Sequence, residues 1–242
     1  MVSPFLSVVI PAYNEEQRIA HTLEVVIQFL EVQAYSCEII VVDDGSEDET
    51  AALVRRFAQN NIGITLVGIP HKGKGSAVKE GMLKARGQYR FLADADLSMP
   101  IEQLQRFLPP TLDKFDIAIG SREVLGSRRF DEPSKRHIMG RVFNLLVRRL
   151  AIKEISDTQC GFKCFRGDVA EQLFNKQKIR GFGFDAEILY MALRLNLKII
   201  ELPIDWNHNS DSKVRPLIDG LAMLRDMIRI RIQNRSPKNL LG

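Results

Sequence analysis

The sequence predicts an α/β fold in which a mostly parallel sheet is flanked by helices. Three observations support this prediction. Apolar runs rich in β-branched residues alternate with amphipathic stretches in the first half, the loops between them are short, and polar residues follow several of the runs. The chain has 242 residues, of which 45% are hydrophobic and 26% charged. These values are typical of a soluble globular protein, so we expect a single domain, 1–242, with basic amphipathic helices in its C-terminal part.

The order of the elements follows from these patterns. Five apolar runs are expected to form strands, at residues 6–10, 38–43, 64–68, 89–93 and 115–120. Helices are expected between them, near residues 15–30, 48–59, 75–85 and 101–108. The second half is expected to contain helices near residues 135–150, 185–195 and 216–232 and a strand near residues 198–204.

Several protein classes are excluded by composition. No apolar run approaches the roughly 18 residues that a transmembrane helix needs, and the N-terminal residues lack the pattern of a secretory signal, so we expect a cytoplasmic protein. Cys37, Cys160 and Cys164 are odd in number and lack paired metal spacing, which argues against a disulfide framework or a zinc site.

Charge is distributed unevenly along the chain. Residues 1–121 contain 11 Lys and Arg against 16 Asp and Glu, whereas residues 122–153 contain nine against three and residues 206–242 seven against three. Two basic segments thus follow an acidic half. Such segments are typical of surfaces that bind phosphates, nucleic acid or anionic lipid, although a basic face in contact only with solvent gives the same pattern.

Paired carboxylates are the most informative local feature. Asp94 and Asp96 directly follow a predicted strand, and Asp43 and Asp44 follow another. If the extended backbone continues through Asp96, alternation places Asp94 and Asp96 on one side, where they can share a divalent cation. A divalent cation held by one or two carboxylates normally completes its shell with water and substrate phosphates, so this site predicts a metal ion with a nucleoside diphosphate, although a solvated loop after a strand would give the same pattern. In open α/β sheets, ligands bind beyond the carboxyl ends of the strands.

Seven segments together resemble the inverting nucleotide-sugar glycosyltransferases of family 2, which have the GT-A fold. They are Val-Val-Ile-Pro-Ala-Tyr-Asn-Glu-Glu at 8–16, Ile-Val-Val-Asp-Asp-Gly-Ser at 40–46, Lys-Gly-Lys-Gly at 72–75, Asp-Ala-Asp at 94–96, Gly-Ser-Arg at 120–122, Asp-Thr-Gln-Cys-Gly-Phe-Lys at 157–163 and Gly-Phe-Gly-Phe-Asp-Ala-Glu at 181–187. The last three are most similar to the dolichyl-phosphate β-glucosyltransferase branch and next to the dolichyl-phosphate mannose synthases. The resemblance spans about residues 6–232, and it implies a nucleotide-binding half, 1–121, and an acceptor-binding half, 122–242.

For the donor, the resemblance implies a site at the ends of the strands. Nucleotide-sugar contacts are expected from Pro11, Tyr13, Glu15, Asp43, Asp44, Lys72, Gly73, Lys74, Asp94, Asp185 and Glu187. Asp96 is expected to be the direct ligand of a Mg²⁺ or Mn²⁺ ion bound to the diphosphate, with Asp94 contacting metal or ribose. A metal there stabilises the charge of the departing nucleoside diphosphate, so Asp96 is the residue whose loss should reduce turnover most.

For the acceptor, the resemblance implies that Arg122 and Arg136 hold the phosphate of a polyprenyl phosphate. Bidentate guanidinium groups suit a phosphate monoester. That phosphate is largely ionised near neutral pH, since its second pKa is about 6, so no strong general base is required. Asp157 is expected to contribute to catalysis, and together with Asp185 and Glu187 to orient sugar hydroxyls or the arginines.

Two segments predict peripheral membrane association. Residues 135–150 combine an apolar face with four arginines, and residues 217–235 interleave apolar and basic residues at helical spacing. Such helices can lie in a membrane interface, although packing on the sheet or in a homo-oligomer would give the same pattern. With one Trp and few aromatic residues suited to base stacking, a nucleic-acid partner is not expected.

The function expected from the sequence is metal-dependent transfer of a hexose to a polyprenyl phosphate with inversion. The expected hexose is glucose, with UDP-glucose as its donor. Alternatives within the same fold are transfer of mannose from GDP-mannose and transfer to a saccharide or protein acceptor. A different enzyme class, the sugar-1-phosphate nucleotidyltransferases, shares the sheet and the metal but places a glycine-rich loop where Pro11, Ala12 and Tyr13 stand here. A catalytically inactive lipid-binding or scaffold protein is a third alternative.

Overall fold

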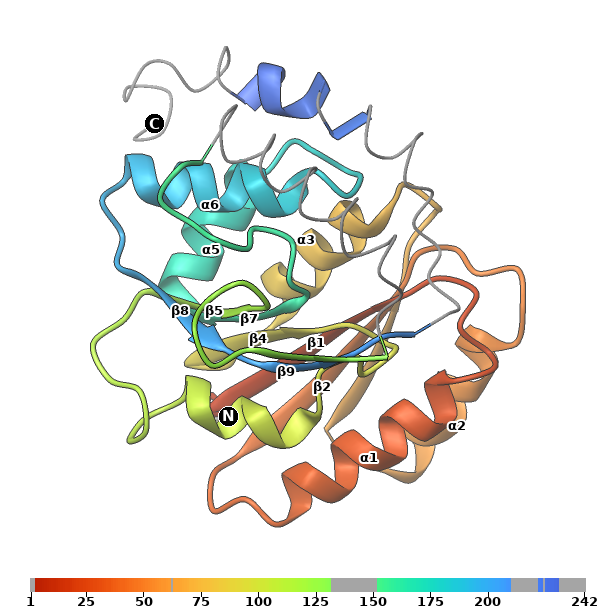
Figure 1. The fold of residues 1–242 in the computed structure, drawn as a ribbon. Helices are drawn as coiled ribbons and strands as arrows, with labels where there is room; N and C mark the ends of the chain where they lie inside the picture. Colours follow the sequence, from red (N-terminus) through yellow and green to blue (C-terminus); the bar gives the residue numbers. More distant parts are fainter. Residues whose placement is uncertain (1–2, 62, 132–151, 210–221, 224, 231–242) are drawn as a thin grey trace.

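The computed structural model describes residues 3–61, 63–131, 152–209, 222–223 and 225–230. Its centre is a seven-stranded sheet with the order β3-β2-β1-β4-β7-β5-β8 (Figure 1). The strands of this sheet are β1 (Leu6–Ala12), β2 (Cys37–Asp43), β3 (Ile64–Gly68), β4 (Tyr89–Ala93), β5 (Ile117–Ser121), β7 (Phe162–Arg166) and β8 (Ile199–Pro203). Among these strands, β7 alone is antiparallel to its neighbours. The mostly parallel sheet predicted from the sequence is confirmed.

Helices cover both faces of the sheet (Figure 1). One layer contains α1 (Ile19–Glu31), α2 (Thr50–Asn60) and the 3₁₀ helix η1 (Ile101–Phe107), and the other contains α3 (Lys74–Lys84), α5 (Gly167–Lys176) and α6 (Phe184–Arg194). A small second sheet pairs β6 (Arg128–Phe130) with β9 (Asp205–Asn207) in parallel.

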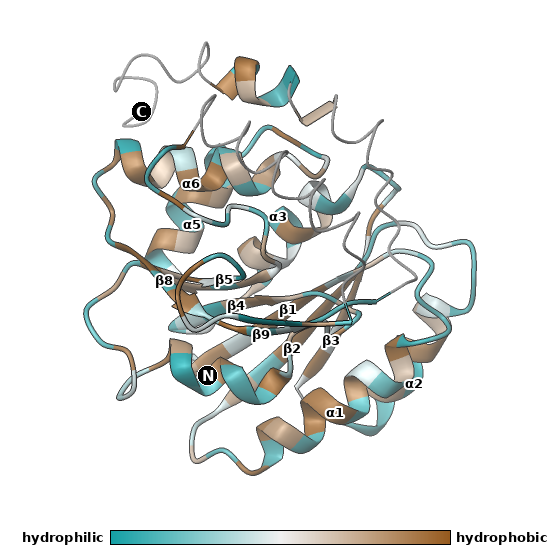
Figure 2. Cartoon of the chain, viewed as in Figure 1, coloured by the Kyte–Doolittle hydropathy of each residue, from teal (hydrophilic) through white to brown (hydrophobic). Residues whose placement is uncertain are grey.

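Alternation along the strands builds two apolar cores, one on each face. In β1, the fully buried Leu6, Val8 and Ile10 join the core beneath α1, whereas Val9 joins the core beneath α3. Because both faces of the sheet are covered, the central strands β1 and β2 are mostly apolar and appear largely brown in Figure 2. No described helix is long and apolar enough to cross a bilayer.

Several predicted elements differ in detail from the structure. The helix expected from residue 15 begins at Ile19, because residues 14–16 bond to the loop after β2 instead. The helix expected near residues 101–108 is the 3₁₀ helix η1. Strand β7 and helix α5 were not predicted. Residues 222–223 and 225–230 are helical, in agreement with the helix expected near residues 216–232, whereas the helix expected near residues 135–150 lies outside the described residues.

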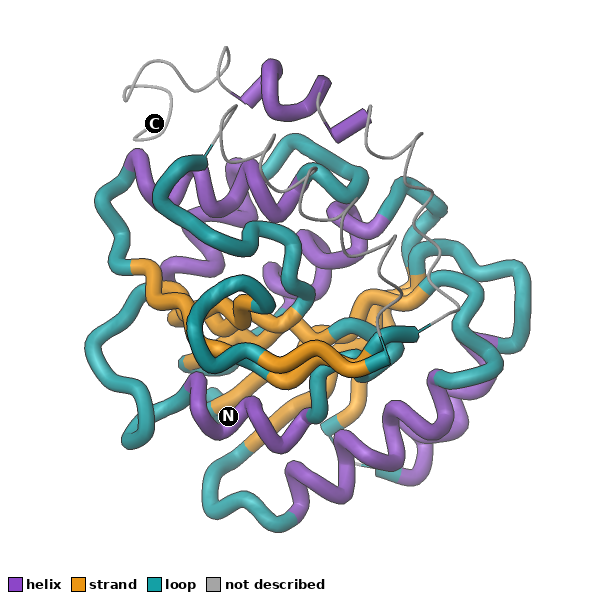
Figure 3. The backbone as a smooth tube through the Cα atoms, in the orientation of Figure 1, coloured by secondary structure: helices purple, strands orange, loops and turns teal. Residues whose placement is uncertain are grey.

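The topology gathers the polar loops at one edge of the sheet. Because β1, β2 and β4 are parallel neighbours, their carboxyl ends meet there, and the loops that leave them lie on the same side (Figure 3). Strand β7 is antiparallel, so its beginning lies at this edge, with Phe162 opposite Ala93. The residues before β7 are thereby placed next to those after β4.

Candidate active site

The loops after β1 and β2 are joined by hydrogen bonds. The backbone N–H of Asn14 donates to Ser46 Oγ at 2.8 Å, and Asn14 Oδ1 accepts from the N–H of Glu47 at 2.8 Å. The N–H of Glu15 donates to Thr50 Oγ1 at 2.7 Å. Asn14 has a φ of 51°, a left-handed conformation that asparagine tolerates better than most residues. The two segments predicted to bind the nucleotide therefore form one unit.

Asp43 and Asp44 are both buried but have different partners. Asp43, 6% exposed, lies 3.3 Å from the backbone N of Ser46 through either carboxylate oxygen. Asp44, 2% exposed, accepts the N–H groups of Lys72 and Gly73, each at 2.9 Å. The Asp44 carboxylate thus holds the predicted glycine-rich loop in place. Its expected contact with the nucleotide stays a prediction.

Tyr13 and His71 stack across this part of the site. Their ring centroids are 4.1 Å apart at an interplanar angle of 20°. His71 Nδ1 also lies 2.9 Å from Asp44 Oδ2. The ring of Tyr13 therefore packs against His71, which is held in turn by Asp44.

Two glycines allow the 72–75 loop to pack against residues 179–181. Gly73 has a φ of +106°, and a Cβ atom there would lie 2.8 Å from the carbonyl oxygen of Arg180. A Cβ atom at Gly75 would lie 2.8 Å from the carbonyl oxygens of Ile179 and Gly181. Both positions therefore require glycine, and this close approach brings the segment before α6 to the donor side.

Lys74 and Asp94 form an ion pair at the edge of the sheet. The Nζ–Oδ1 distance is 2.6 Å, and each side chain is 24% exposed. Burial acts to lower the pKa of Lys74, but the carboxylates of Asp94, Asp185 and Asp96 together raise it. On its other side, Asp94 is packed so closely against Gly161 that a Cβ atom there would lie 1.9 Å from Asp94 Oδ2. The Asp94 carboxylate is therefore held between Lys74 and the residues before β7.

Asp96 lies in a turn rather than in an extended strand. Strand β4 ends at Ala93, residues 95–96 form a turn, and Asp96 Oδ1 accepts the N–H of Ser98 at 2.9 Å. The geometry expected from strand alternation is therefore absent, and the turn is fixed by the Thr22 hydroxyl, which donates to the Ala95 carbonyl at 2.6 Å.

The described residues contain no cluster of three or more His, Cys, Asp or Glu side chains able to hold a metal by themselves. The Asp94 and Asp96 carboxylates both act on Lys74, and oxygen ligands of this kind suit Mg²⁺ or Mn²⁺, which normally complete their shell with water and substrate phosphates.

A second ion pair lies deeper in the protein. Lys163 of β7 is 1% exposed, and its ammonium group donates to Asp185 Oδ1 and to the Cys160 carbonyl, each at 2.5 Å. Burial raises the pKa of Asp185, against the opposing charges of Lys163 and Lys74. Lys163 also acts to lower the pKa of Asp157. The ion pairs Lys74–Asp94, Lys163–Asp185 and Arg122–Asp157 therefore form a network of charges that act on one another's pKa.

Arg122 and Asp157 are paired through several hydrogen bonds. Arg122 Nε donates to Asp157 Oδ2 at 2.7 Å, Nη2 donates to Oδ1 at 2.9 Å, and the backbone N–H of Arg122 donates to Oδ2 at 3.0 Å. Burial alone would raise the pKa of Asp157, but the charge and hydrogen bonds of Arg122 lower it to about 2. The guanidinium carbon also lies 5.6 Å from the ring centroid of Trp206. Arg122 is thus fixed in direction by two neighbours.

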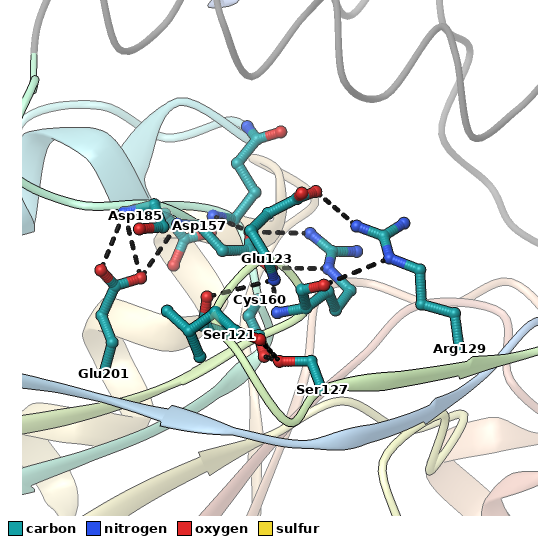
Figure 4. Close-up of polar contacts among 12 residues, drawn as sticks. Ser121, Glu123, Ser127, Arg129, Asp157, Cys160, Asp185 and Glu201 are labelled. Carbon is teal, nitrogen blue, oxygen red and sulfur yellow. Dashed lines mark hydrogen bonds and ion pairs between the residues drawn. The ribbon is translucent and has the colours of Figure 1, made fainter.

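Asp44, Glu187 and Glu201 share one kind of contact: the carboxylate of each accepts hydrogen bonds from the backbone N–H groups of two successive loop residues. We call these three residues the carboxylate clamps. Glu187 accepts from Lys178 and Ile179 at 3.0 and 2.8 Å. Glu201 accepts from Ser156 and Asp157 at 2.9 to 3.1 Å (Figure 4). Burial raises the pKa of Glu187, although these N–H groups oppose the effect. The clamps fix the backbone of the loops around the site.

Most of the predicted site residues lie at the edge of the sheet where β1, β2 and β4 end. For Asp44, Lys74 and Asp157, the structure identifies hydrogen-bond or ion-pair partners that the sequence did not predict. Arg136 lies outside the described residues, so its role stays a prediction. Lys163, Glu201 and Trp206 were not predicted. Lys163 could have been noticed in the sequence, because a charged residue between the apolar residues Phe162 and Cys164 indicates a buried charge that needs a partner.

Comparison with known proteins decides the family. The family model described as "Glycosyl transferase family 2" matches residues 7–174. The chain belongs to glycosyl transferase family 2. This family 2 chain is therefore a glycosyltransferase, which decides against nucleotidyl transfer and confirms the resemblance noted in the sequence.

Curated relatives within family 2 are similar over most of the chain. A protein named dolichyl-phosphate β-glucosyltransferase from Dictyostelium discoideum is 36% identical over 95% of this chain and 74% of its own length. Proteins with the same name from Homo sapiens and Saccharomyces cerevisiae are 34% and 33% identical, each over 94% of this chain and over 75% and 74% of their own lengths.

Solved structures confirm the fold. A glucosyl-3-phosphoglycerate synthase from Mycobacterium tuberculosis in complex with Mn²⁺ and UDP-glucose superposes with a TM-score of 0.63 at 20% identity, over 95% of this chain and 78% of that one. The same enzyme in complex with UDP gives a TM-score of 0.61 over 94% and 78%. The GT-A fold expected from the sequence is therefore confirmed.

Proposed function

We propose that this glycosyltransferase moves glucose from UDP-glucose to a polyprenyl phosphate such as dolichyl phosphate, and that it requires Mg²⁺ or Mn²⁺. The similarity to dolichyl-phosphate β-glucosyltransferases over nearly the whole chain supports the sugar and the acceptor. The observation that carries the proposal is the position of two ion pairs, Lys74–Asp94 just beyond the carboxyl end of β4 and Arg122–Asp157 just beyond the carboxyl end of β5.

The donor is proposed to bind at the ends of β1, β2 and β4. Tyr13 offers an aromatic face to the base, and Asp43 offers a carboxylate that can accept a ring N–H. Lys74 is the first residue of α3, and its ammonium group, 2.6 Å from Asp94 Oδ1, can turn from Asp94 toward an incoming diphosphate. Asp96 and Asp94 would hold the divalent ion, which as a Lewis acid would stabilise the charge that develops on the leaving diphosphate.

The acceptor is proposed to bind at Arg122, on the other side of the network. Pairing with Asp157 occupies Nε and one N–H of Nη2, which leaves the remaining N–H groups of the guanidinium for a phosphate oxygen. The phosphate monoester is largely dianionic near neutral pH, because its second pKa is about 6, so it attacks without a strong base. Attack on the face opposite the leaving diphosphate inverts the anomeric carbon and yields a β-linked product.

The acceptor's lipid places the reaction at a membrane surface, and we propose that the enzyme binds peripherally to its cytoplasmic face. The basic amphipathic segments near residues 135–150 and 216–232 are the proposed contacts. This attachment predicts sedimentation with anionic vesicles that weakens as salt is added, and absence of binding at low salt would contradict it.

Asp96→Asn tests the proposed function directly. The change preserves shape but removes a charge, so transfer from UDP-glucose to a short-chain dolichyl phosphate should fall by at least about a hundredfold, comparable with the loss of an electrostatic stabiliser at other active sites. Glucosylated lipid is measured by mass spectrometry with Mg²⁺ or Mn²⁺ present. Glu171→Gln, on the exposed side of α5, is the control. Unchanged turnover in Asp96→Asn would refute the assignment, and transfer only from GDP-mannose would refute the donor.

A further inference from the structure

We infer that Glu201 is a positioning residue that sets the direction of Arg122 toward the acceptor phosphate. The inference rests on the proposed function, because it assumes that Arg122 receives that phosphate. The Glu201 carboxylate binds the backbone N–H groups of Ser156 and Asp157 and not the carboxylates of the donor side. It acts through the backbone of Asp157, the partner of Arg122.

The first step is the contact between Glu201 and the Asp157 segment. Glu201 Oε1 lies 3.0 Å from Ser156 N and 3.1 Å from Asp157 N, and Oε2 lies 2.9 Å from Ser156 N. Figure 4 shows Glu201 pointing from its strand toward this segment. Two successive N–H groups are thus bound by one carboxylate, which is a charge-assisted arrangement and stronger than hydrogen bonds between neutral groups. This contact fixes the backbone at Ser156 and Asp157.

The second step links Asp157 to Arg122. Asp157 Oδ2 accepts both the backbone N–H and Nε of Arg122, while Oδ1 accepts Nη2. The carboxylate of Asp157 is 4% exposed, whereas the side chain of Arg122 is 24% exposed. The buried acid therefore sets the plane of a guanidinium that still reaches solvent.

The third step is the rigidity of the frame. Arg122 directly follows β5, and Glu201 lies in β8, the parallel neighbour of β5, with Ile119 opposite Glu201 and Ser121 opposite Pro203. Arg122 and Glu201 are consequently attached to two hydrogen-bonded strands, and the Asp157 segment bridges them. A shift of that segment would therefore move the Asp157 carboxylate and rotate the Arg122 guanidinium paired with it.

The experiment compares three variants of the full chain. Glu201→Met removes both acceptor oxygens at similar volume, Glu201→Gln keeps one oxygen, and Glu171→Met makes the same change at an exposed position on α5. Glu201→Met should raise the KM for a short-chain dolichyl phosphate about tenfold, equivalent to about 1.4 kcal/mol, with the KM for UDP-glucose changed less than about twofold. Glu201→Gln should give a smaller rise, because Oε1 alone can still accept both N–H groups. Glu171→Met should leave both constants unchanged.

A double-mutant cycle with Arg122→Lys tests the route of the effect. Since Glu201 acts through Arg122, Glu201→Met should add less than about twofold to the acceptor KM in an Arg122→Lys background. Trp206 is the single tryptophan of the chain and lies beside Arg122, so its emission should change as wild-type protein is titrated with the same lipid phosphate. The midpoint of that titration should shift with the acceptor KM in Glu201→Met, or in Glu201→Gln if the Met variant does not fold.

The outcomes separate this inference from the proposed function. The inference is wrong, and the proposed function stands, if Arg122→Lys raises the acceptor KM but the Glu201 variants do not raise it selectively. That outcome is either an equal rise in the KM for the lipid phosphate and for UDP-glucose, or no rise in either. If Arg122→Lys leaves the acceptor KM unchanged, or Trp206 emission does not respond to saturating acceptor, the acceptor site itself is misplaced.

Discussion

Replacing Asp157 with asparagine should lower the stability of the protein in a way that depends on pH. In the folded protein Arg122 lowers the pKa of Asp157 from 3.8 to about 2. A pKa difference of one corresponds to about 1.4 kcal/mol, so the ionised carboxylate stabilises the folded state by about 2 kcal/mol at neutral pH. Asp157 is only 4% exposed, so solvent screening reduces this value little. The neutral amide of asparagine cannot supply that charge, and we expect the free energy of unfolding to fall by this amount at pH 7.

The sign of the pH effect follows from the depressed pKa. A carboxyl group that is more acidic when folded contributes its full stabilisation above its unfolded pKa, near 4, and loses it as pH falls toward its folded pKa, near 2. At pH 3, about 1 kcal/mol of the stabilisation should be gone. The difference in unfolding free energy between wild type and Asp157→Asn should therefore shrink between pH 7 and pH 3.

Urea unfolding, followed by circular dichroism at both pH values, measures this difference. Asp168→Asn is a matched control, because Asp168 also pairs with an arginine but is 66% exposed. Its effect at pH 7 should be below about 1 kcal/mol, as for other exposed ion pairs. A difference between wild type and Asp157→Asn that is the same at pH 7 and pH 3 would show that the Arg122 pair does not stabilise the fold through charge, and the reasoning would fail.

Three further predictions concern the neighbouring charges. Gly161→Ala should reduce transfer at least about tenfold with a stability loss of about 1–3 kcal/mol, because its Cβ atom would displace the Asp94 carboxylate; normal turnover would contradict this. Lys74→Met should tighten binding of Mn²⁺ in the absence of nucleotide, measured by calorimetry, since the ammonium group no longer competes for Asp94; weaker binding would refute the competition. Lys163→Met should cost about 3–5 kcal/mol in urea unfolding by leaving Asp185 buried and unpaired, and a loss below about 1 kcal/mol would contradict the buried pair.

The first half of the fold was predictable because its signals are local. Strands β1 to β4 are mostly apolar, and their parallel direction follows from the helices between them. Strand β7 was missed because Lys163 interrupts its apolar run, and the reason that a lysine is tolerated there is Asp185, 22 residues later. The late start of α1 was equally hidden, since residues 14–16 are held by side chains of residues 46–50.

The candidate site was predictable in its residue types and less so in its contacts. The acidic pairs and the glycine loop were visible as motifs at strand ends. The partners of Asp44, Lys74 and Asp157 were not, because each lies at least 20 residues away in the chain and is brought near only by the fold. Glu201 had no signal at all, since its partners are backbone N–H groups and leave no trace in the residue pattern.

The carboxylate clamps have a consequence for how the loops can vary in evolution. Their donors are main-chain groups, so the side chains at positions 72, 156 and 178 can change without loss of the anchor, provided that proline, which lacks the N–H, does not enter. A substitution scan should thus find that positions 156 and 178 tolerate most residues but not proline, whereas Glu201 and Glu187, which bind their N–H groups, tolerate few replacements. The side chains of these loops are thus open to selection while the shape of the backbone is retained.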